Sequence, residues 1–271
     1  MAAGAAIPEE VRFAACHTAV VTPDPPEGAG GAVVRRPGWV LFMTAMPTVS
    51  YVDPFDVDVS ALPDVVREVR EVLRGRGRRQ TAWTVPARSP LHDALVETGM
   101  KPNDESPLQP TEWCMATVEP PRVTPPDGVE VRLAESEDDY LAGAELAGDV
   151  FGMSAADRAG ARKGWLHRHG LVSQGLPAGE TFLAFLEGRL VGYGHAKSND
   201  CSVALFGSGV VPEARGRGVY AALVAARWDF AVGIGRPALI VGAGSMSRPR
   251  LERLGFQSVQ ELAVLKDVLP S

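Results

Sequence analysis

The sequence predicts a mixed α/β fold of the α+β type, in which a mostly antiparallel sheet is flanked by helices. Three observations support this class. Apolar segments separated by tight-turn residues follow one another from 181 to 211, as in an antiparallel meander. A glycine-rich loop then joins the end of a strand to the start of a helix. With 45% hydrophobic and 22% charged residues, the 271-residue chain can build a core, which excludes a disordered tail.

The first part of the chain, residues 1–118, is predicted to form a domain of its own. A proline- and glycine-rich excursion at 22–31 comes first. The patterns then predict a helix over 61–74, a strand over 80–85 and a helix over 89–98 that ends at Gly99. Residues 119–128 (EPPRVTPPDG) are expected to form an extended linker, which leaves 129–271 as the second domain.

The second domain is expected to begin with a strand at 129–133 and helices over 134–150 and 155–169. Glu187 and Gly188 predict a hairpin between strands over 181–186 and 189–197, because glycine supplies the positive φ of a tight turn. A second turn at 198–200 leads into a strand over 201–211. The final expected elements are a helix that runs to Trp228, a strand over 238–241 and a helix over 247–254 that Gly255 closes.

The two halves show a weak internal similarity. Residues 95–100 (LVETGM) align with residues 251–256 (LERLGF), at the same distance from the start of the preceding long helix. We interpret this as an internal duplication with a degenerate first copy. The chance alignment of two helix C-termini is the alternative.

Charge and cysteine content exclude several function classes. The formal net charge of −6 disfavours bulk nucleic-acid binding, which depends on Lys and Arg. No segment approaches the length of apolar sequence that a membrane helix needs, and the start of the chain lacks the features of a signal peptide, so no membrane association and no processing are expected. Cys16, Cys114 and Cys201 show no metal-ligand spacing, so no metal and a reducing cytoplasm are expected.

The glycine-rich loop Arg215-Gly216-Arg217-Gly218 predicts an anion site. It lies between a strand and a helix, where free helix amides and the helix dipole attract negative charge. It lacks the P-loop pattern and the three-glycine dinucleotide fingerprint, so the pyrophosphate of another cofactor is implied. A plain tight turn with solvated arginines is the alternative, but the order strand, loop, helix favours the anion site.

At this point the sequence resembles the GNAT superfamily of acyl-CoA-dependent N-acyltransferases. Residues 210–220 (VVPEARGRGVY) are similar to the family's V-x-P-x-x-R-G-x-G motif, and residues 251–256 resemble its closing helix and Gly-Phe. The similarity covers roughly 129–267, and the whole chain looks like actinobacterial tandem proteins with a degenerate first half. The resemblance implies a GNAT-like sheet and acetyl-CoA as co-substrate. The residues it implies for cofactor binding are Gly209, Val210 and Val211 along the pantetheine arm, and Arg215, Gly216, Arg217, Gly218, Val219 and Tyr220 around the pyrophosphate.

Several family positions depart from the pattern. Tyr220 stands where a small residue is usual, and Leu251 replaces the tyrosine that often donates a proton to the thiolate. Gly244 replaces an asparagine that often contacts the cofactor, and the strand over 201–211 holds no acid to act as a base.

His195 is the candidate catalytic residue. With a turn centred near Asn199, antiparallel pairing would place His195 opposite Val203 and Tyr193 opposite Leu205. His195 would then face the middle of the strand over 201–211. An ordinary histidine pKa of about 6.5 would suit a proton acceptor. A buried structural histidine is the alternative for His195. Asp200 and Glu213 are alternative bases, and Ser208 could bind substrate.

The predicted function is therefore N-acetyl transfer from acetyl-CoA to an amine of a small molecule or peptide. The alternative is a catalytically inactive acyl-CoA-binding sensor or scaffold. Residues 51–58 (YVDPFDVD), at the corresponding helix entrance of the first half, are acidic and would repel a pyrophosphate. The first half is thus expected to act as a structural partner that completes the acceptor cleft. A monomer or homodimer is expected.

Overall fold

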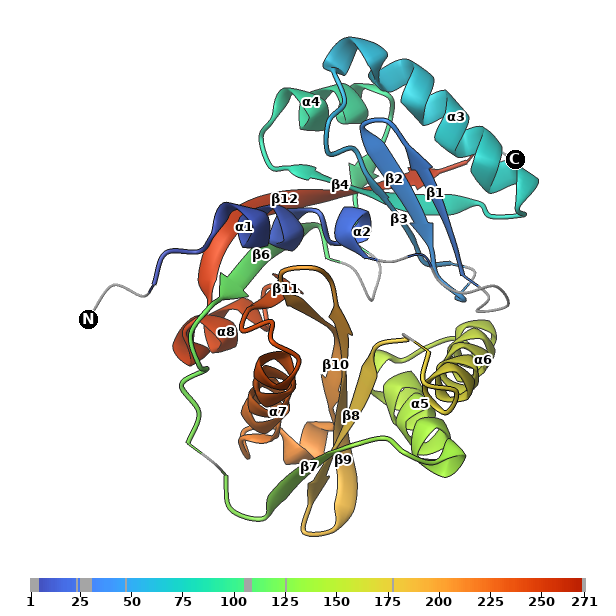
Figure 1. Cartoon of the computed structure of the whole chain (residues 1–271). Coiled ribbons are helices and arrows are strands. Elements are labelled where there is room, and N and C mark those ends of the chain that lie inside the picture. The colour runs from blue at the N-terminus through green and yellow to red at the C-terminus, as the bar shows by residue number, and fades with distance from the viewer. Residues whose placement is uncertain are drawn as a thin grey trace.

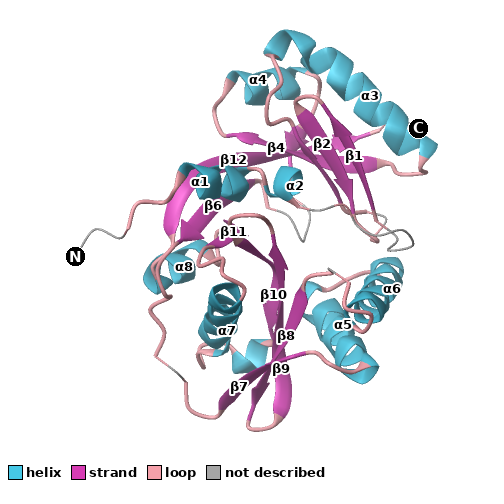
Figure 2. Cartoon of the chain, in the orientation of Figure 1, coloured by secondary structure: helices cyan, strands magenta, loops and turns pink. Residues whose placement is uncertain are grey.

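The computed structural model describes residues 5–22, 24, 31–46, 48–104, 109–124, 126–176 and 178–269. Most of the excursion expected at 22–31 lies outside these ranges. Within them, 12 strands form one continuous mixed sheet with the order β1-β2-β3-β4-β12-β6-β11-β10-β9-β8-β7, and β5 pairs with β12. Helices cover the sheet (Figures 1 and 2), as the α+β prediction requires. In the described ranges, no helix has the length and apolar character needed to cross a membrane.

The N-terminal half begins with two short helices, α1 (Glu9–Cys16) and α2 (Thr18–Val21). An antiparallel meander follows: β1 (Ala32–Arg36), β2 (Trp39–Met43) and β3 (Ser50–Asp53). The remaining elements are η1 (Val59–Ala61), α3 (Leu62–Gly75), β4 (Gln80–Pro86), α4 (Pro90–Glu97), β5 (Lys101–Pro102) and β6 (Thr111–Thr117). The predicted helix, strand and second helix are thus present, with the second helix starting after its cap residue Ser89.

The C-terminal half contains β7 (Val129–Leu133), α5 (Glu137–Phe151), α6 (Ala155–Val172), β8 (Glu180–Leu186), β9 (Arg189–Ser198) and β10 (Val203–Val210). It ends with η2 (Pro212–Ala214), α7 (Val219–Gly233), β11 (Leu239–Ala243), α8 (Arg248–Leu254) and β12 (Gln257–Val268). Helix α5 begins later than predicted, because Ser136 and Asp139 form a capping box at its start. The predicted turn at Glu187 and Gly188 is present, with φ of 52° and 79°.

The same supersecondary unit occurs in both halves. In the first, α3 connects the parallel strands β3 and β4, and α4 follows; in the second, α7 connects the parallel strands β10 and β11, and α8 follows. Both closing helices are followed by a glycine with positive φ, Gly99 at 92° and Gly255 at 101°. This repeated order supports the predicted duplication.

The two halves exchange the strands that follow their closing helices. Strand β6, at the end of the first half, pairs with β11 of the second half. Strand β12, at the end of the chain, pairs with β4 of the first half, and β6 and β12 also pair with each other. Figure 1 shows β12, in red, crossing into the N-terminal half. The predicted domain boundary at 119–128 stays a prediction. The sheet itself is continuous across both halves.

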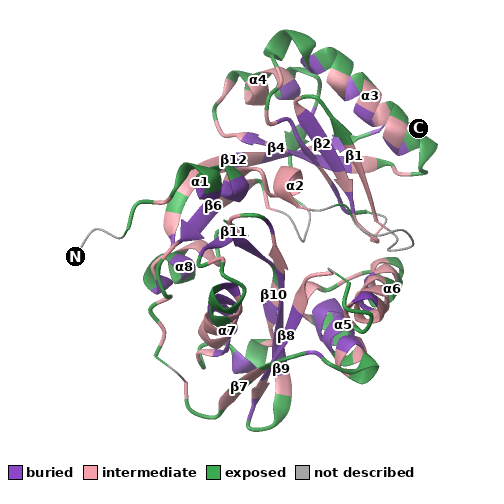
Figure 3. Cartoon of the chain, in the orientation of Figure 1, coloured by how far each residue is buried: buried purple, intermediate pink, exposed green. Residues whose placement is uncertain are grey.

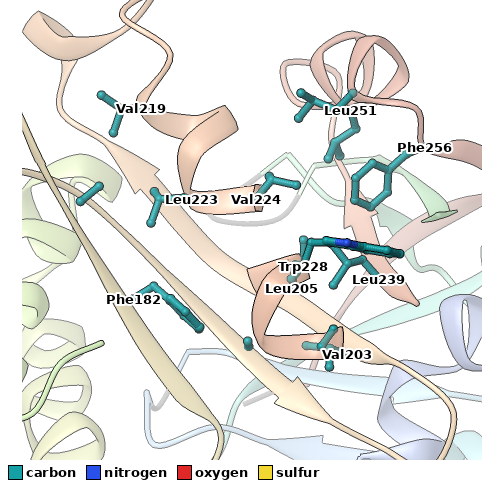
Figure 4. Packing of buried hydrophobic residues seen from close by; sticks show 14 of the residues in the cluster. Phe182, Val203, Leu205, Val219, Leu223, Val224, Trp228, Leu239, Leu251 and Phe256 are labelled. Carbon is teal, nitrogen blue, oxygen red and sulfur yellow. The ribbon is translucent and has the colours of Figure 1, made fainter. Parts of the chain in front are cut away.

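The largest core of the C-terminal half lies between α7, α8 and the sheet. Val219, Leu223, Val224 and Trp228 of α7 are buried against the strands, and Figure 4 shows Trp228 near Leu239 of β11 and Phe256. The N-terminal half has its own core under α3, whose outer face is exposed (Figure 3). Helix α1 packs on the opposite face of the central strands, against Cys114, Ile240 and Leu262. These cores fix the position of the strands that carry the site.

Candidate active site

The central feature of the site is a fork between two parallel strands. Strands β10 and β11 pair from Val203 and Leu239 to Leu205 and Val241, and among the described residues the pairing stops there. The last part of β10 also shifts register against β9 between Phe206 and Gly209. Beyond Leu205, the edge of β10 that faces β11 has no strand partner in the described part of the chain. The predicted cofactor residues Gly209 and Val210 lie along this open edge.

The glycine-rich loop begins where β10 ends. Gly218 is the N-cap of α7 with φ of 80°, a conformation that favours glycine, and Ala222 is the first helical amide to find an acceptor, the Gly218 carbonyl at 3.0 Å. Within the described residues, the amides of Val219, Tyr220 and Ala221 have no backbone acceptor. The Arg217 amide, in contrast, already donates to Ala214. The free amides thus begin after Arg217, at the N-terminus of α7.

The other predicted cofactor residues make contacts of their own. The Val211 amide donates to the Val191 carbonyl at 2.9 Å, so it is not free for a ligand. Arg215 Nε donates to the Val210 carbonyl at 3.1 Å. The Arg217 guanidinium pairs with Glu187 at 3.1 Å. Gly216 has open space around its α-carbon, with φ of 81°.

Tyr220 and Arg250 add a feature that the loop motif does not predict. Burial raises the pKa of the Tyr220 phenol, while the nearby Arg227 and Arg250 guanidinium groups act in the opposite direction. Arg250 comes from α8 and lines the same cavity as Tyr220. The positive charge of Arg250 therefore lies near the N-terminus of α7. Because Arg250 belongs to α8, the sequence of the loop does not predict this.

The loop and the fork open into one cavity of about 1390 Å³ that both halves line. From the C-terminal half it includes Gly209, Val210, Gly216, Gly218 and Tyr220, and from the N-terminal half Phe42, Tyr51, Asp53, Glu112 and Cys114. Helix α6 also reaches the N-terminal half, since Thr48 Oγ1 donates to Asp157 at 2.9 Å. The first half therefore forms one wall of the cavity.

Glu112 on β6 brings a carboxylate to the fork. A β-carbon placed on Gly242 would lie 1.4 Å from Glu112 Oε1, so the carboxylate lies directly over β11, next to the last paired residue Val241. Burial raises the pKa of Glu112. Burial first, and then the Glu112 charge, raise the pKa of the Tyr51 phenol. Sequence reasoning missed Glu112 because the strand exchange that brings β6 to β11 leaves no local signal.

Next to Glu112, the space above Gly244 is also filled from the N-terminal half. Gln109 Oε1 accepts hydrogen bonds from the Ser245 amide at 2.9 Å and the Ser245 hydroxyl at 3.0 Å. A β-carbon on Gly244 would lie 2.7 Å from this oxygen. An amide side chain from the N-terminal half, that of Gln109, thus lies beside Gly244, the position where the family pattern often has an asparagine.

His195 is placed differently from the prediction. It pairs with Phe206, and Tyr193 pairs with Gly209, rather than with Val203 and Leu205. The reason is a longer turn, in which Asn199 Oδ1 accepts hydrogen bonds from the Cys201 and Ser202 amides. The register prediction is therefore wrong.

The surroundings of His195 also differ from the expected partly solvated site. The residue is 6% exposed, its Nδ1 accepts a hydrogen bond from Arg168 at 2.6 Å, and Thr181 Oγ1 lies 3.1 Å from the same nitrogen. Burial, and then the charges of Arg168 and Arg227, lower its pKa well below the ordinary value. The expectation of a pKa near neutrality is therefore wrong.

The remaining candidates have clear partners or positions. Glu213 pairs with Arg189 on the surface, and Ser208 Oγ accepts a hydrogen bond from Arg227 at 2.7 Å. Asp200 lies in the turn after β9 and lines the cavity. Leu251 is fully buried in the core. In the described ranges, no group of three or more His, Cys, Asp and Glu side chains could hold a metal.

Comparisons with known proteins agree with this geometry. Residues 153–256 match the model of the Acetyltransferase (GNAT) family. The fold is similar to a GCN5-related N-acetyltransferase from Kribbella flavida, with a TM-score of 0.65, 19% identity and coverage of 97% of this chain and 96% of that chain. A GCN5-related N-acetyltransferase from Sphaerobacter thermophilus gives a TM-score of 0.63 at 19% identity, over 99% of this chain and 95% of that chain.

A third similar structure is a tandem GNAT protein from the clavulanic acid biosynthesis pathway. Its TM-score is 0.59 at 17% identity, over 98% of this chain and 90% of that chain. No curated protein shows significant sequence similarity to the chain.

Proposed function

We propose that the chain, whose residues 153–256 match the GNAT acetyltransferase family model, transfers an acetyl group from acetyl-CoA to an amine of a small molecule or peptide. One observation carries this proposal: the open fork of β10 and β11 leads directly to the unpaired amides at the N-terminus of α7. The first feature suits an extended pantetheine arm, and the second suits a pyrophosphate.

The residues present fit the co-substrate. The open edge at Gly209 and Val210 would hold the pantetheine arm, and the amides of Val219, Tyr220 and Ala221 would hold the pyrophosphate. Arg250 beside Tyr220 would add charge to the same site. When bound, acetyl-CoA would supply an activated thioester carbonyl, and this chain's residues would place the acceptor amine against it.

We propose Glu112 as the proton acceptor. In the reaction, a C–N bond forms between the amine and the acetyl carbonyl, the C–S bond breaks, and the electron pair leaves with sulfur. The ammonium proton must be removed, and a half-buried carboxylate over the fork, whose pKa is raised, is a better base than an ordinary exposed glutamate. The nitrogen loses its second proton after the C–N bond forms, and water can pass this proton to the departing sulfur, so no side-chain donor for the thiolate is required.

His195 stays a second candidate for this role. It lines the cavity, but its Nδ1 is already occupied by Arg168 and its pKa is lowered. If His195 were the base, His195→Gln would lower the rate by about 10²-fold to 10⁴-fold and remove an inflection from the pH profile of the rate. We expect instead that this variant keeps the pH profile of the rate, whereas Glu112→Gln changes it.

A catalytically inactive acyl-CoA-binding sensor is the alternative function. The buried Leu251 at the usual donor position favours it, because this side chain can neither donate nor reach the cavity. Retained acetyl-CoA binding without transfer to any acceptor would support the sensor.

The experiment combines calorimetric titration of acetyl-CoA with a mass-spectrometric search of amine metabolites as acceptors. One acetyl-CoA per chain and at least one acetylated amine are expected. Absence of binding at millimolar acetyl-CoA would reject both functions. Two acetyl-CoA molecules per chain would contradict the purely structural role proposed for the first half.

The cytoplasm stays the proposed location. Cys16, Cys114 and Cys201 are all free thiols, as suits a reducing compartment. The assembly as a monomer or homodimer also stays a prediction.

A further inference from the structure

Arg168 of α6 is a half-buried cation that lines the cavity. Its Nη1 donates to His195 at 2.6 Å and to Thr181 at 3.3 Å, and its guanidinium carbon lies 5.7 Å from the centre of the Phe206 ring. Phe206 is the first residue of β10 beyond the paired part of the fork. Arg168 therefore lies beside the point where the strands separate.

The guanidinium of Arg168 has unused donors. Within the described residues, it forms no ion pair within 4.0 Å, and its Nε and Nη2 have no hydrogen-bond acceptor. These two nitrogens are not sealed inside the protein, in contrast to Arg227 Nη2, and Arg168 lines the cavity. Burial lowers the pKa of Arg168 to about 10, and the group remains a cation at neutral pH. A half-buried guanidinium with free donors beside a cavity is suited to bind an anion.

A second cation lies on the same side of the cavity as Arg168. Glu180 of β8 is the nearest carboxylate that influences its pKa, but it lies beyond ion-pair distance. Lys197 of β9 also lines the cavity, and burial followed by the charge of Arg168 lowers its pKa to about 8. Two cations thus lie on this side.

The opposite wall is acidic. Glu112 lies over Gly242 of β11, and Asp53 of β3, which pairs with His17 at 3.0 Å, lines the same cavity further on. Arg168 lies above β9 and β10, and Glu112 lies over β11 beyond the end of the β10–β11 pairing, so at least about two strand spacings, ~10 Å, separate the cation from the Glu112 carboxylate. The opposite charges therefore lie on either side of the fork.

We propose that the acceptor is a zwitterionic amine of the amino-acid type, whose carboxylate binds Arg168 while its ammonium group faces Glu112. This inference rests on the proposed acetyl transfer and names its substrate class. A hydrogen bond of about 3 Å at each end takes up part of the distance between Arg168 and Glu112. The rest leaves room for an amino group and a carboxylate that are a few bonds apart. Arg168 acts as a specificity residue that binds substrate.

The test uses matched pairs of acceptors that differ only by the carboxylate: alanine and ethylamine, phenylalanine and 2-phenylethylamine, and lysine and cadaverine. Wild-type protein should have at least a tenfold higher kcat/KM for the amino acid than for its decarboxylated partner. In the presence of CoA, it should also bind the amino acid at least tenfold more tightly. Binding by calorimetry decides the question for any pair without turnover. Equal or better use of the decarboxylated amines throughout would overturn the proposal.

Variants of Arg168 separate a specificity role from a structural one. Arg168→Gln should raise KM about tenfold or more for the amino acid relative to its decarboxylated partner, and Arg168→Lys should restore part of the preference. Arg162→Gln is the matched control, because Arg162 lies on the same helix and pairs with Glu145 at the surface. An equal loss for both members of each pair would overturn the specificity role. Acetyl-CoA affinity, measured separately, tests the proposed function itself: its absence would reject acetyl transfer, whereas normal affinity without carboxylate preference rejects only the zwitterion.

Discussion

Gly242→Ala tests the role of Glu112 without changing Glu112. A β-carbon at this position would lie 1.4 Å from Glu112 Oε1 and 2.5 Å from its carboxyl carbon. Since non-bonded atoms approach to only about 3.5 Å, the carboxylate oxygen must move by about 2 Å. A misplacement of about 1 Å can cost 10²-fold in rate, so kcat should fall by about that factor or more. The backbone at Gly242 does not have positive φ, so alanine itself is compatible with the strand.

The assay is kcat for acetyl transfer, with acetyl-CoA affinity measured in parallel. Glu112→Gln should lose a similar factor, and the double variant Gly242→Ala/Glu112→Gln should be no slower than Glu112→Gln alone, because both changes remove the same group. Gly244→Ala is the matched control, since its β-carbon would displace Gln109 instead and should lower kcat by less than about tenfold. Wild-type kcat in Gly242→Ala, or losses that multiply in the double variant, would refute the reasoning.

Two further predictions concern stability and assembly. The raised pKa of Glu112 means that folding favours its protonated form, so its contribution to stability is present at low pH and is lost as pH rises through the folded pKa. Glu112→Gln should therefore increase Tm relative to wild type more at pH 8 than at pH 4; a pH-independent difference would contradict this. Separately expressed residues 129–271 should neither fold nor bind acetyl-CoA, whereas coexpression with 1–118 should restore a complex, because β6 and β12 are exchanged. Wild-type affinity in 129–271 alone would contradict the exchange as a folding requirement.

Local sequence signals predicted the C-terminal elements well. The turn at Glu187 and Gly188, the helix after Gly218 and the cap at Gly255 all depend on residues close together in the chain. The turn after β9 was harder, because its length depends on hydrogen bonds of the Asn199 side chain. The three-residue error in register changed which residue faces His195, although both strands were correctly placed in the order of elements.

The acceptor side of the site could not be predicted in the same way. Glu112 and Gly242 are far apart in sequence and meet only because β6 of one half pairs with β11 of the other. The lowered pKa of His195 depends first on burial and then on the charges of Arg168 and Arg227, which come from two different helices. Neither arrangement follows from spacing or hydrophobic pattern, since both are results of how the halves pack.

The central claim is that acetyl-CoA binds at the fork with its pyrophosphate at the loop before α7. Gly216→Asp and Gly216→Asn test it most directly, because both residues tolerate positive φ, the site around Gly216 is open, and the two side chains differ by one charge. At an assumed separation of about 5 Å, one added charge repels a phosphate charge by about 1 to 3 kcal/mol, for effective dielectric constants of about 80 to 20. Calorimetry should show one acetyl-CoA per wild-type chain, near-wild-type affinity in Gly216→Asn, and an affinity lower by about 5-fold to 150-fold in Gly216→Asp. Equal affinities of the two variants would contradict pyrophosphate binding at this loop.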